Sequence, residues 1–235
     1  MHLSCIKYIY VSIFLIITGL KISDNTYASL LSTNNEYQYI KCTAWYPRPE
    51  PANLVAVGLA TGRIVLTSFG KGSSQDPHRL CGKEFVPKHQ RQCSYLAWNP
   101  VESNLLAEGL EKHRADYSVL IWDVYHQQRA CFSEEPGIIQ KTSVELGSSE
   151  ITSSLAWFPQ EPQSLVTGMS NKFLRIFDLR DTSRPQSAAY TKAVYGVKVD
   201  PCCQHRLASF HEVSAEIVSE SFQKKEIREF IIFYL

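Results

Sequence analysis

The chain has 235 residues and a formal net charge of +1, and it is 44% hydrophobic and 20% charged. This ordinary globular composition supplies enough apolar residues for a sizeable core, and its balanced charge excludes a general electrostatic basis for binding nucleic acid or an anionic membrane. Eleven glycines and eleven prolines divide the chain into many short segments, which is typical of an all-β protein.

The N-terminus begins with an apolar stretch, residues 8–20, that follows Lys7. Such a stretch is typical of a secretory signal, and it is too short for a comfortable transmembrane span of about 20 residues. A divergent or non-native start to the domain is the alternative. The six cysteines beyond residue 20 lack zinc-ligand spacing, which favours reduced thiols in the cytosol.

A tryptophan followed two residues later by proline occurs three times, and a weaker fourth copy covers residues 199–201. Proline cannot donate to a strand ladder, so each copy predicts the end of a strand. The predicted inner strands are 40–45, 93–98, 153–157 and 194–199.

Two further strands are predicted in the repeats. The second strands, 54–58, 105–109, 165–168 and 207–210, are almost wholly apolar, so we expect burial on both faces. The third segments, 62–68, 118–123 and 172–178, alternate, and the last two end in Trp122-Asp123 and Phe177-Asp178. Repeats of this length indicate propellers or solenoids.

The pattern resembles WD-repeat β-propellers. His89 lies nine residues before Trp98 and Asp116 lies six before Trp122, where that family places a histidine and an aspartate. The resemblance implies a buried, hydrogen-bonded structural pair rather than a catalytic one. Leu110 stands where the family has a hydroxyl, so we expect the set to be incomplete.

Three stretches are more specific: residues 82–93, 112–123 and 177–194, which include the linkers between strands. They resemble the N-terminal propeller of the Mio (missing oocyte) family over about residues 23–210. The resemblance implies a non-enzymatic scaffold of the second GATOR (SEA) subcomplex, which promotes amino-acid-dependent activation of target-of-rapamycin complex 1. It implies other WD-repeat subunits as partners, no cofactor, and a cytoplasmic place at the lysosomal or vacuolar surface, with only indirect membrane association.

The expected architecture is an all-β partial propeller of about three and a half blades, with a ring that does not close within this chain. Residues 1–22 are the divergent start, 23–211 the partial propeller and 212–235 a divergent tail. These departures predict a fragment or a truncated isoform.

No nucleotide-binding, hydrolase or metalloprotease motif occurs in the sequence, so no catalytic, cofactor-binding or metal residue and no small-molecule substrate is predicted. Two other functions stay open. Phe177-Asp178-Leu179-Arg180 resembles a motif of substrate receptors of cullin-type ubiquitin ligases, which makes Arg180 a possible docking residue. A secreted protein with a cleaved signal is the other.

Basic residues of the second repeat form either a solvated rim or a docking patch; they are Lys88, Arg91, Lys112, His113 and Arg114. The predicted structural residues of the blades are Trp45, Pro47, His89, Trp98, Pro100, Asp116, Trp122, Asp123, Trp157, Pro159, Phe177 and Asp178.

Overall fold

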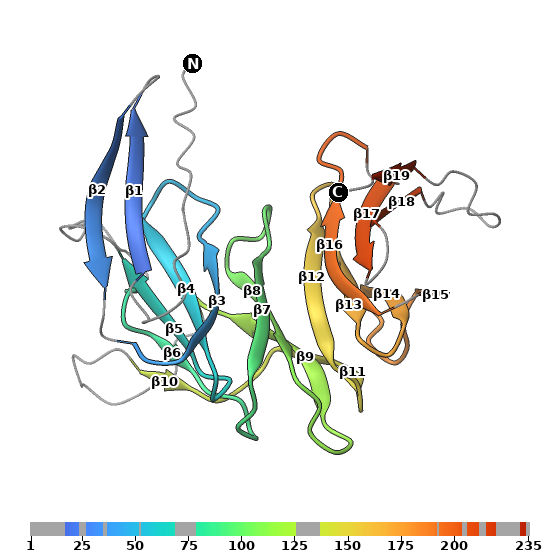
Figure 1. Cartoon of the computed structure of the whole chain (residues 1–235). Helices are drawn as coiled ribbons and strands as arrows, with labels where there is room; N and C mark the ends of the chain where they lie inside the picture. The colour runs from blue at the N-terminus through green and yellow to red at the C-terminus, as the bar shows by residue number, and fades with distance from the viewer. Residues whose placement is uncertain are drawn as a thin grey trace.

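The computed structural model describes residues 17–23, 27–34, 37–51, 53–68, 79–125, 137–191, 193–203, 206–211, 215–219 and 231–233. Their regular elements are all β-strands, arranged in five sheets (Figure 1). Among the residues that are described, there is no helix with the length and apolar character needed to cross a bilayer. The predicted all-β class is therefore confirmed.

Four of the sheets correspond to the four sequence repeats and are named blades 1 to 4. Blade 1 contains β3 (Ile40–Trp45), β4 (Leu54–Leu59), β5 (Ile64–Ser68) and β6 (Glu84–Phe85). Blade 2 contains β7 (Cys93–Trp98), β8 (Leu105–Leu110), β9 (Tyr117–Asp123) and β11 (Val144–Ser148). Blade 3 contains β12 (Thr152–Phe158), β13 (Glu161–Met169), β14 (Phe173–Asp178) and β15 (Ser187–Tyr190). Blade 4 contains β16 (Val194–Val199), β17 (Arg206–His211), β18 (Ala215–Ser219) and β19 (Ile231–Phe233).

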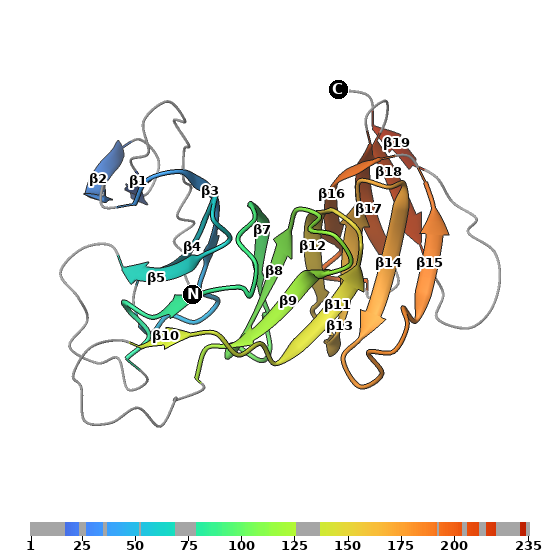
Figure 2. The same ribbon diagram turned by 90° about the horizontal axis from the view of Figure 1, so that it is seen from below.

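The blades follow one another along an open arc, with the inner strands β3, β7, β12 and β16 adjacent to each other (Figure 2). The fifth sheet is an antiparallel hairpin of β1 (Ile17–Ser23) and β2 (Tyr27–Asn34), which lies on the side of blade 1 that is away from blade 2 (Figure 1). The arc agrees with the predicted partial propeller whose ring is not closed.

The three larger apolar clusters lie between the blades, and a smaller one lies within blade 1 around Val55 and Val57. One buried cluster joins blades 1 and 2 around Phe85 and Trp122, and a second joins blades 2 and 3 around Ile121 and Trp157. A third joins blade 3 to blade 4 through Val194 and its neighbours. Each sheet is therefore stabilised by burying a face against the next sheet.

Blade 4 differs from the sequence prediction in two ways. It has four strands rather than half a blade, because β18 and β19 of the expected divergent tail pair with β17 and with each other. The expected burial of 207–210 on both faces is wrong: β17 alternates, and Phe210 is 47% exposed. Leu207 is buried in the cluster shared with blade 3, and Ser209 lies on the same face of β17, whereas the opposite face, which carries Phe210, is exposed.

One strand crosses between blades in a way that the repeats did not predict. The chain leaving β9 forms β10 (Ile138–Ile139), which pairs in parallel with β6 of blade 1 before it returns to blade 2 as β11. The backbone N–H of Val86 donates to the carbonyl of Ile139 at 2.9 Å, and the Ile139 side chain is buried in the cluster between blades 1 and 2. This crossing ties the outer part of blade 1 to blade 2.

Candidate functional site

The tryptophans of the inner strands make a repeated contact between blades. Trp98 Nε1 donates to the carbonyl of Ala44 at 3.1 Å, and Trp157 Nε1 donates to the carbonyl of Ala97 at 2.9 Å. In both cases the acceptor is the residue before the tryptophan of the preceding blade. Each indole is thus buried with its N–H satisfied, and it fixes the position of one blade on the next.

The other predicted blade residues take related positions. The strands β3 and β7 end before Pro47 and Pro100, and β12 ends before Pro159. Phe177 is 3% exposed, in the cluster between blades 2 and 3. Trp45 is half-buried against Val55 and Val57.

In a second repeated contact, a side chain of the next blade lies close to the backbone of one glycine in each of the first three blades. A Cβ added to Gly58 would lie 2.5 Å from Cys93 Sγ, and one added to Gly168 would lie 2.6 Å from Val194 Cγ1. The Gly109 position is similar, with Thr152 Cγ2 at 2.9 Å. The contacted residue is always five positions before the tryptophan of the next blade, or before Val199 in blade 4.

His89 and Asp116 meet in blade 2, as the resemblance implied. His89 Nδ1 lies 2.9 Å from Asp116 Oδ2, and Arg91 Nη1 lies 3.1 Å from the same oxygen. Partial burial tends to raise the pKa of Asp116, but the His89 hydrogen bond and the Arg91 charge hold that pKa below its ordinary value. The expected burial is wrong for His89, whose side chain is 41% exposed and stacks on the His113 ring at 4.5 Å between centroids.

Arg91 is buried, whereas the sequence predicts it in an exposed rim or docking patch. It is 8% exposed and also donates to the carbonyl of Tyr117. Burial lowers the pKa of its guanidinium, against the opposing charge of Asp116. Lys88, Lys112 and Arg114 are exposed, so the basic surface of blade 2 consists of fewer cations than expected.

Blade 3 has a corresponding polar cluster with different residues. Glu150 lies seven residues before Trp157, as Arg91 lies seven before Trp98, and Asn171 takes the place of Asp116. Asn171 Nδ2 donates to Glu150 Oε1 at 3.0 Å, and Arg175 Nη2 lies 2.6 Å from the same oxygen. The position seven before the tryptophan was the sequence signal that could have identified both residues.

Among the described residues, one group of side chains has the composition of a metal site. The ligand atoms of His89, His113 and Asp116 lie within 4.8 Å of one another. The Arg91 guanidinium already neutralises the Asp116 carboxylate, and the two imidazole rings are stacked at an interplanar angle of 20° instead of converging on one point. This arrangement opposes a cation and suits an inter-strand polar contact.

Trp122 contacts a buried acid. Its Nε1 donates to Glu108 Oε2 at 2.9 Å, and both residues are fully buried between blades 1 and 2. Burial raises the pKa of Glu108 to about 8, although the Trp122 hydrogen bond and the Arg91 charge act in the opposite direction. Glu108 is therefore mostly a neutral acid at pH 7.

The aspartates that follow the third strands act in tight turns. Asp123 Oδ1 accepts from the backbone N–H of Tyr125, and Asp178 Oδ1 accepts from that of Arg180. Arg180, the possible docking residue, is 72% exposed in its side chain, and its Nη2 lies 2.6 Å from Asp178 Oδ2. Hydrogen bonds from Arg180 hold the pKa of Asp178 below its ordinary value.

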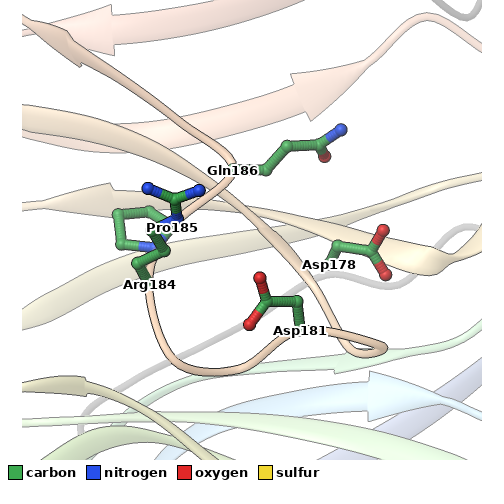
Figure 3. Close-up of a pocket in the computed structure, with 5 residues that line it drawn as sticks. All are labelled: Asp178, Asp181, Arg184, Pro185 and Gln186. Atoms are coloured by element: carbon green, nitrogen blue, oxygen red, sulfur yellow. The ribbon is translucent and has the colours of Figure 1, made fainter.

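Next to this turn, the segment between β14 and β15 borders an open, polar surface pocket of about 400 Å³ (Figure 3). The carboxylates of Asp178 and Asp181 and the guanidinium of Arg184 line it, together with Pro185 and Gln186. Asp181 Oδ1 accepts a hydrogen bond from Ser183 Oγ at 2.6 Å. These are local contacts of an exposed turn.

Comparison with known proteins agrees with this arrangement. Residues 19–228 match the family model described as MIOS, WD40 repeat. The chain is 48% identical to GATOR2 complex protein MIOS-A of Xenopus laevis and 46% identical to GATOR2 complex protein MIOS of Danio rerio, in each case over 83% of this chain and 23% of the relative. It is 36% identical to GATOR2 complex protein MIOS of Dictyostelium discoideum over 79% of this chain and 20% of the relative.

The chain thus spans about a fifth to a quarter of the length of these relatives. The residues that the family match covers include blades 1 to 3, with their repeated tryptophans, glycines and prolines, and strands β16, β17 and β18 of blade 4. The predicted resemblance is confirmed, and the chain belongs to the MIOS WD40-repeat family.

Proposed function

We propose that this chain is a non-enzymatic scaffold module of a GATOR2-type complex, and that it contributes to amino-acid-dependent activation of target-of-rapamycin complex 1. The observation that carries the proposal is the 46–48% identity to GATOR2 complex proteins across 83% of the chain. Its partners are other WD-repeat subunits of that complex. It acts in the cytoplasm at the lysosomal or vacuolar surface, and any contact with the membrane is indirect.

The geometry of the blades supports this proposal. The ionisable side chains of blade 2 are engaged in contacts between strands. His89 and Arg91 contact the Asp116 carboxylate, and the Glu108 carboxyl accepts a hydrogen bond from Trp122. A scaffold needs such rigid sheets with free loops and edges, since binding residues are placed on loops by a rigid support. The exposed cations Lys112 and Arg114 lie in the loop between β8 and β9 and provide one such surface.

Co-expression of the full chain with the other WD-repeat subunits, followed by size-exclusion chromatography, tests the proposal. We expect the chain to elute with them as one complex. Reversing the charge of Lys112 and Arg114 together should weaken the complex if this loop docks, whereas Lys141→Glu, at another exposed lysine, should not. Elution of the folded chain alone, away from every subunit, would contradict the proposal.

A substrate receptor of a cullin-type ubiquitin ligase is the second candidate function, and the exposure of Arg180 favours it. Docking through Arg180 requires its guanidinium to exchange Asp178 for an acceptor on the adaptor. Binding of the ligase adaptor that is lost in Arg180→Ala and kept in Arg184→Ala would support this function. Absence of adaptor binding to the intact chain would rule it out.

A further inference from the structure

Two cysteine sulfurs meet at the interface of blades 1 and 2. Cys42 lies in β3 and Cys93 begins β7, 51 positions later, yet their Sγ atoms are 3.3 Å apart. Both are free thiols; Cys93 is fully buried and Cys42 is half-buried. A disulfide has an S–S length of about 2.0 Å, so a small movement of the two side chains would bring the sulfurs to bonding distance.

The surrounding backbone holds the sulfurs together. A Cβ added to Gly58 would lie 2.5 Å from Cys93 Sγ and 2.7 Å from Cys42 Sγ, so the two sulfurs fill the space that the missing side chain leaves. At the corresponding positions of the next interfaces, Thr152 faces Gly109 and Val194 faces Gly168. The space next to the glycine can therefore be filled by residues that have no thiol. The pair of sulfurs is specific to the interface of blades 1 and 2.

The two thiols differ in their surroundings. Burial raises the pKa of the Cys93 thiol, and the neighbouring Cys42 thiol and Glu108 carboxyl raise it further. Cys93 is thus a neutral, enclosed thiol at pH 7. The half-buried Cys42 is the sulfur that a small oxidant reaches first, because oxidation of cysteine depends on access to the sulfur.

We propose that Cys42 and Cys93 are a modification site, a dithiol that a hydroperoxide converts into a disulfide between β3 and β7. The Cys42 sulfur attacks one peroxide oxygen, the O–O bond breaks, and the products with hydrogen peroxide are a sulfenic acid and water. The Cys93 sulfur then displaces the hydroxyl group, which leaves as a second water with the Cys93 thiol proton. The two sulfurs together lose two electrons and the peroxide gains them.

The disulfide would join blade 1 covalently to blade 2. It would also constrain the unfolded chain over the 51-residue separation, which stabilises the folded state relative to the unfolded one. Cytosolic thiols reduce such bonds by exchange, so the link is reversible there. The expected consequence is an interface that becomes more resistant to opening under peroxide and returns to its former state after reduction.

Peptide mapping of the full chain tests this proposal. The folded chain is treated with hydrogen peroxide, its remaining thiols are alkylated, and it is digested with trypsin without reductant. We expect a linked pair of peptides covering residues 42–63 and 92–112, two hydrogen atoms lighter than their sum, and its loss after dithiothreitol. The oxidised chain should also unfold at a higher temperature than the reduced chain.

Two variants make the test specific. In Cys42→Ala the linked peptides and the shift in unfolding temperature should both be absent, whereas Cys81→Ala, at an exposed cysteine, should keep both. Full alkylation of Cys42 and Cys93 in the treated wild-type chain would overturn the proposal. So would a sulfinic acid at Cys42 without a link, or a link from either cysteine to Cys202 or Cys203. The mapping of the wild-type chain decides the matter even if a variant fails to fold.

Discussion

At the scale of single residues, the repeated tryptophan has two structural functions, one for its ring and one for its N–H group. Its ring fills an apolar cluster between blades, and its N–H bonds to the backbone of the preceding blade, as Trp157 does to Ala97. The sequence predicted the burial, because a tryptophan before a proline at the end of a strand recurs. It could not predict the acceptor, since a backbone carbonyl on another sheet carries no sequence signal.

The two functions can be separated by substitution. Trp157→Ala should lower the free energy of unfolding by about 3–5 kcal/mol, as expected for loss of a buried aromatic side chain. Trp157→Phe should lower it by about 1–3 kcal/mol, because it keeps a ring and leaves the Ala97 carbonyl without its donor. Denaturant titration of the full chain measures both. Equal and small effects of the two variants would show that Trp157 is not buried as described.

The glycines are a second residue-scale feature with a direct test. Gly168→Ala should be destabilising by about 1–3 kcal/mol, since the new methyl group would overlap Val194 and Val197 across the blade interface. Gly137→Ala is the matched control, because a Cβ there meets no atom within 4 Å. Thermal unfolding of the two variants should therefore differ, and equal midpoints would contradict the close approach of blades 3 and 4.

The buried acid Glu108 predicts a dependence on pH. Its pKa is raised from 4.5 to about 8 in the folded chain, so between these values the folded state holds a proton that the unfolded state has released. Its contribution to stability is fully present below about pH 4.5 and is lost as the pH rises through about 8. Glu108→Gln should flatten this part of the stability profile in denaturant titrations from pH 5 to 8. An unchanged slope in the variant would contradict the assignment.

At the scale of strands, the inner three strands of blades 1 to 3 and the first two strands of blade 4 were predictable, and the outer ones were not. The segments 54–58, 105–109 and 165–168 of β4, β8 and β13 are largely apolar because both faces are buried there, and prolines mark the ends of β3, β7 and β12. The outer strands β6 and β10 have only two residues each, too few to show a period. The third strand of blade 4 has no terminal Trp-Asp, so β18 was missed although it pairs with β17.

The crossing strand β10 provides the test at this scale. Ile139 is 3% exposed in the cluster between blades 1 and 2, whereas its neighbour Ile138 is 51% exposed. Ile139→Ala should cost about 2–5 kcal/mol of stability, and Ile138→Ala should change it little. Chemical denaturation of this matched pair checks the prediction. If the two variants proved equally stable, the pairing of β10 with blade 1 would be wrong.

At the scale of the whole molecule, contacts between successive blades determine the architecture. Each interface uses an apolar cluster and a glycine approach, and the first two also use an indole hydrogen bond. Blade 4 has Val199 in place of the tryptophan, and Phe210 lies eleven residues further on, where a glycine occurs in blades 2 and 3. The repeat could therefore be predicted from the sequence, whereas the structure of the outward face of blade 4 could not.

The central proposal is that this chain is a rigid stack of blades that binds other WD-repeat subunits of a GATOR2-type complex. Hydrogen–deuterium exchange of the full chain, alone and with those subunits, tests it most directly. We predict slow exchange in β4, β8 and β13 of the chain alone, because these strands are buried between sheets. We also predict added protection of exposed loops and edges when the subunits are present. Fast exchange throughout β4, β8 and β13, or no change on adding the subunits, would contradict the account.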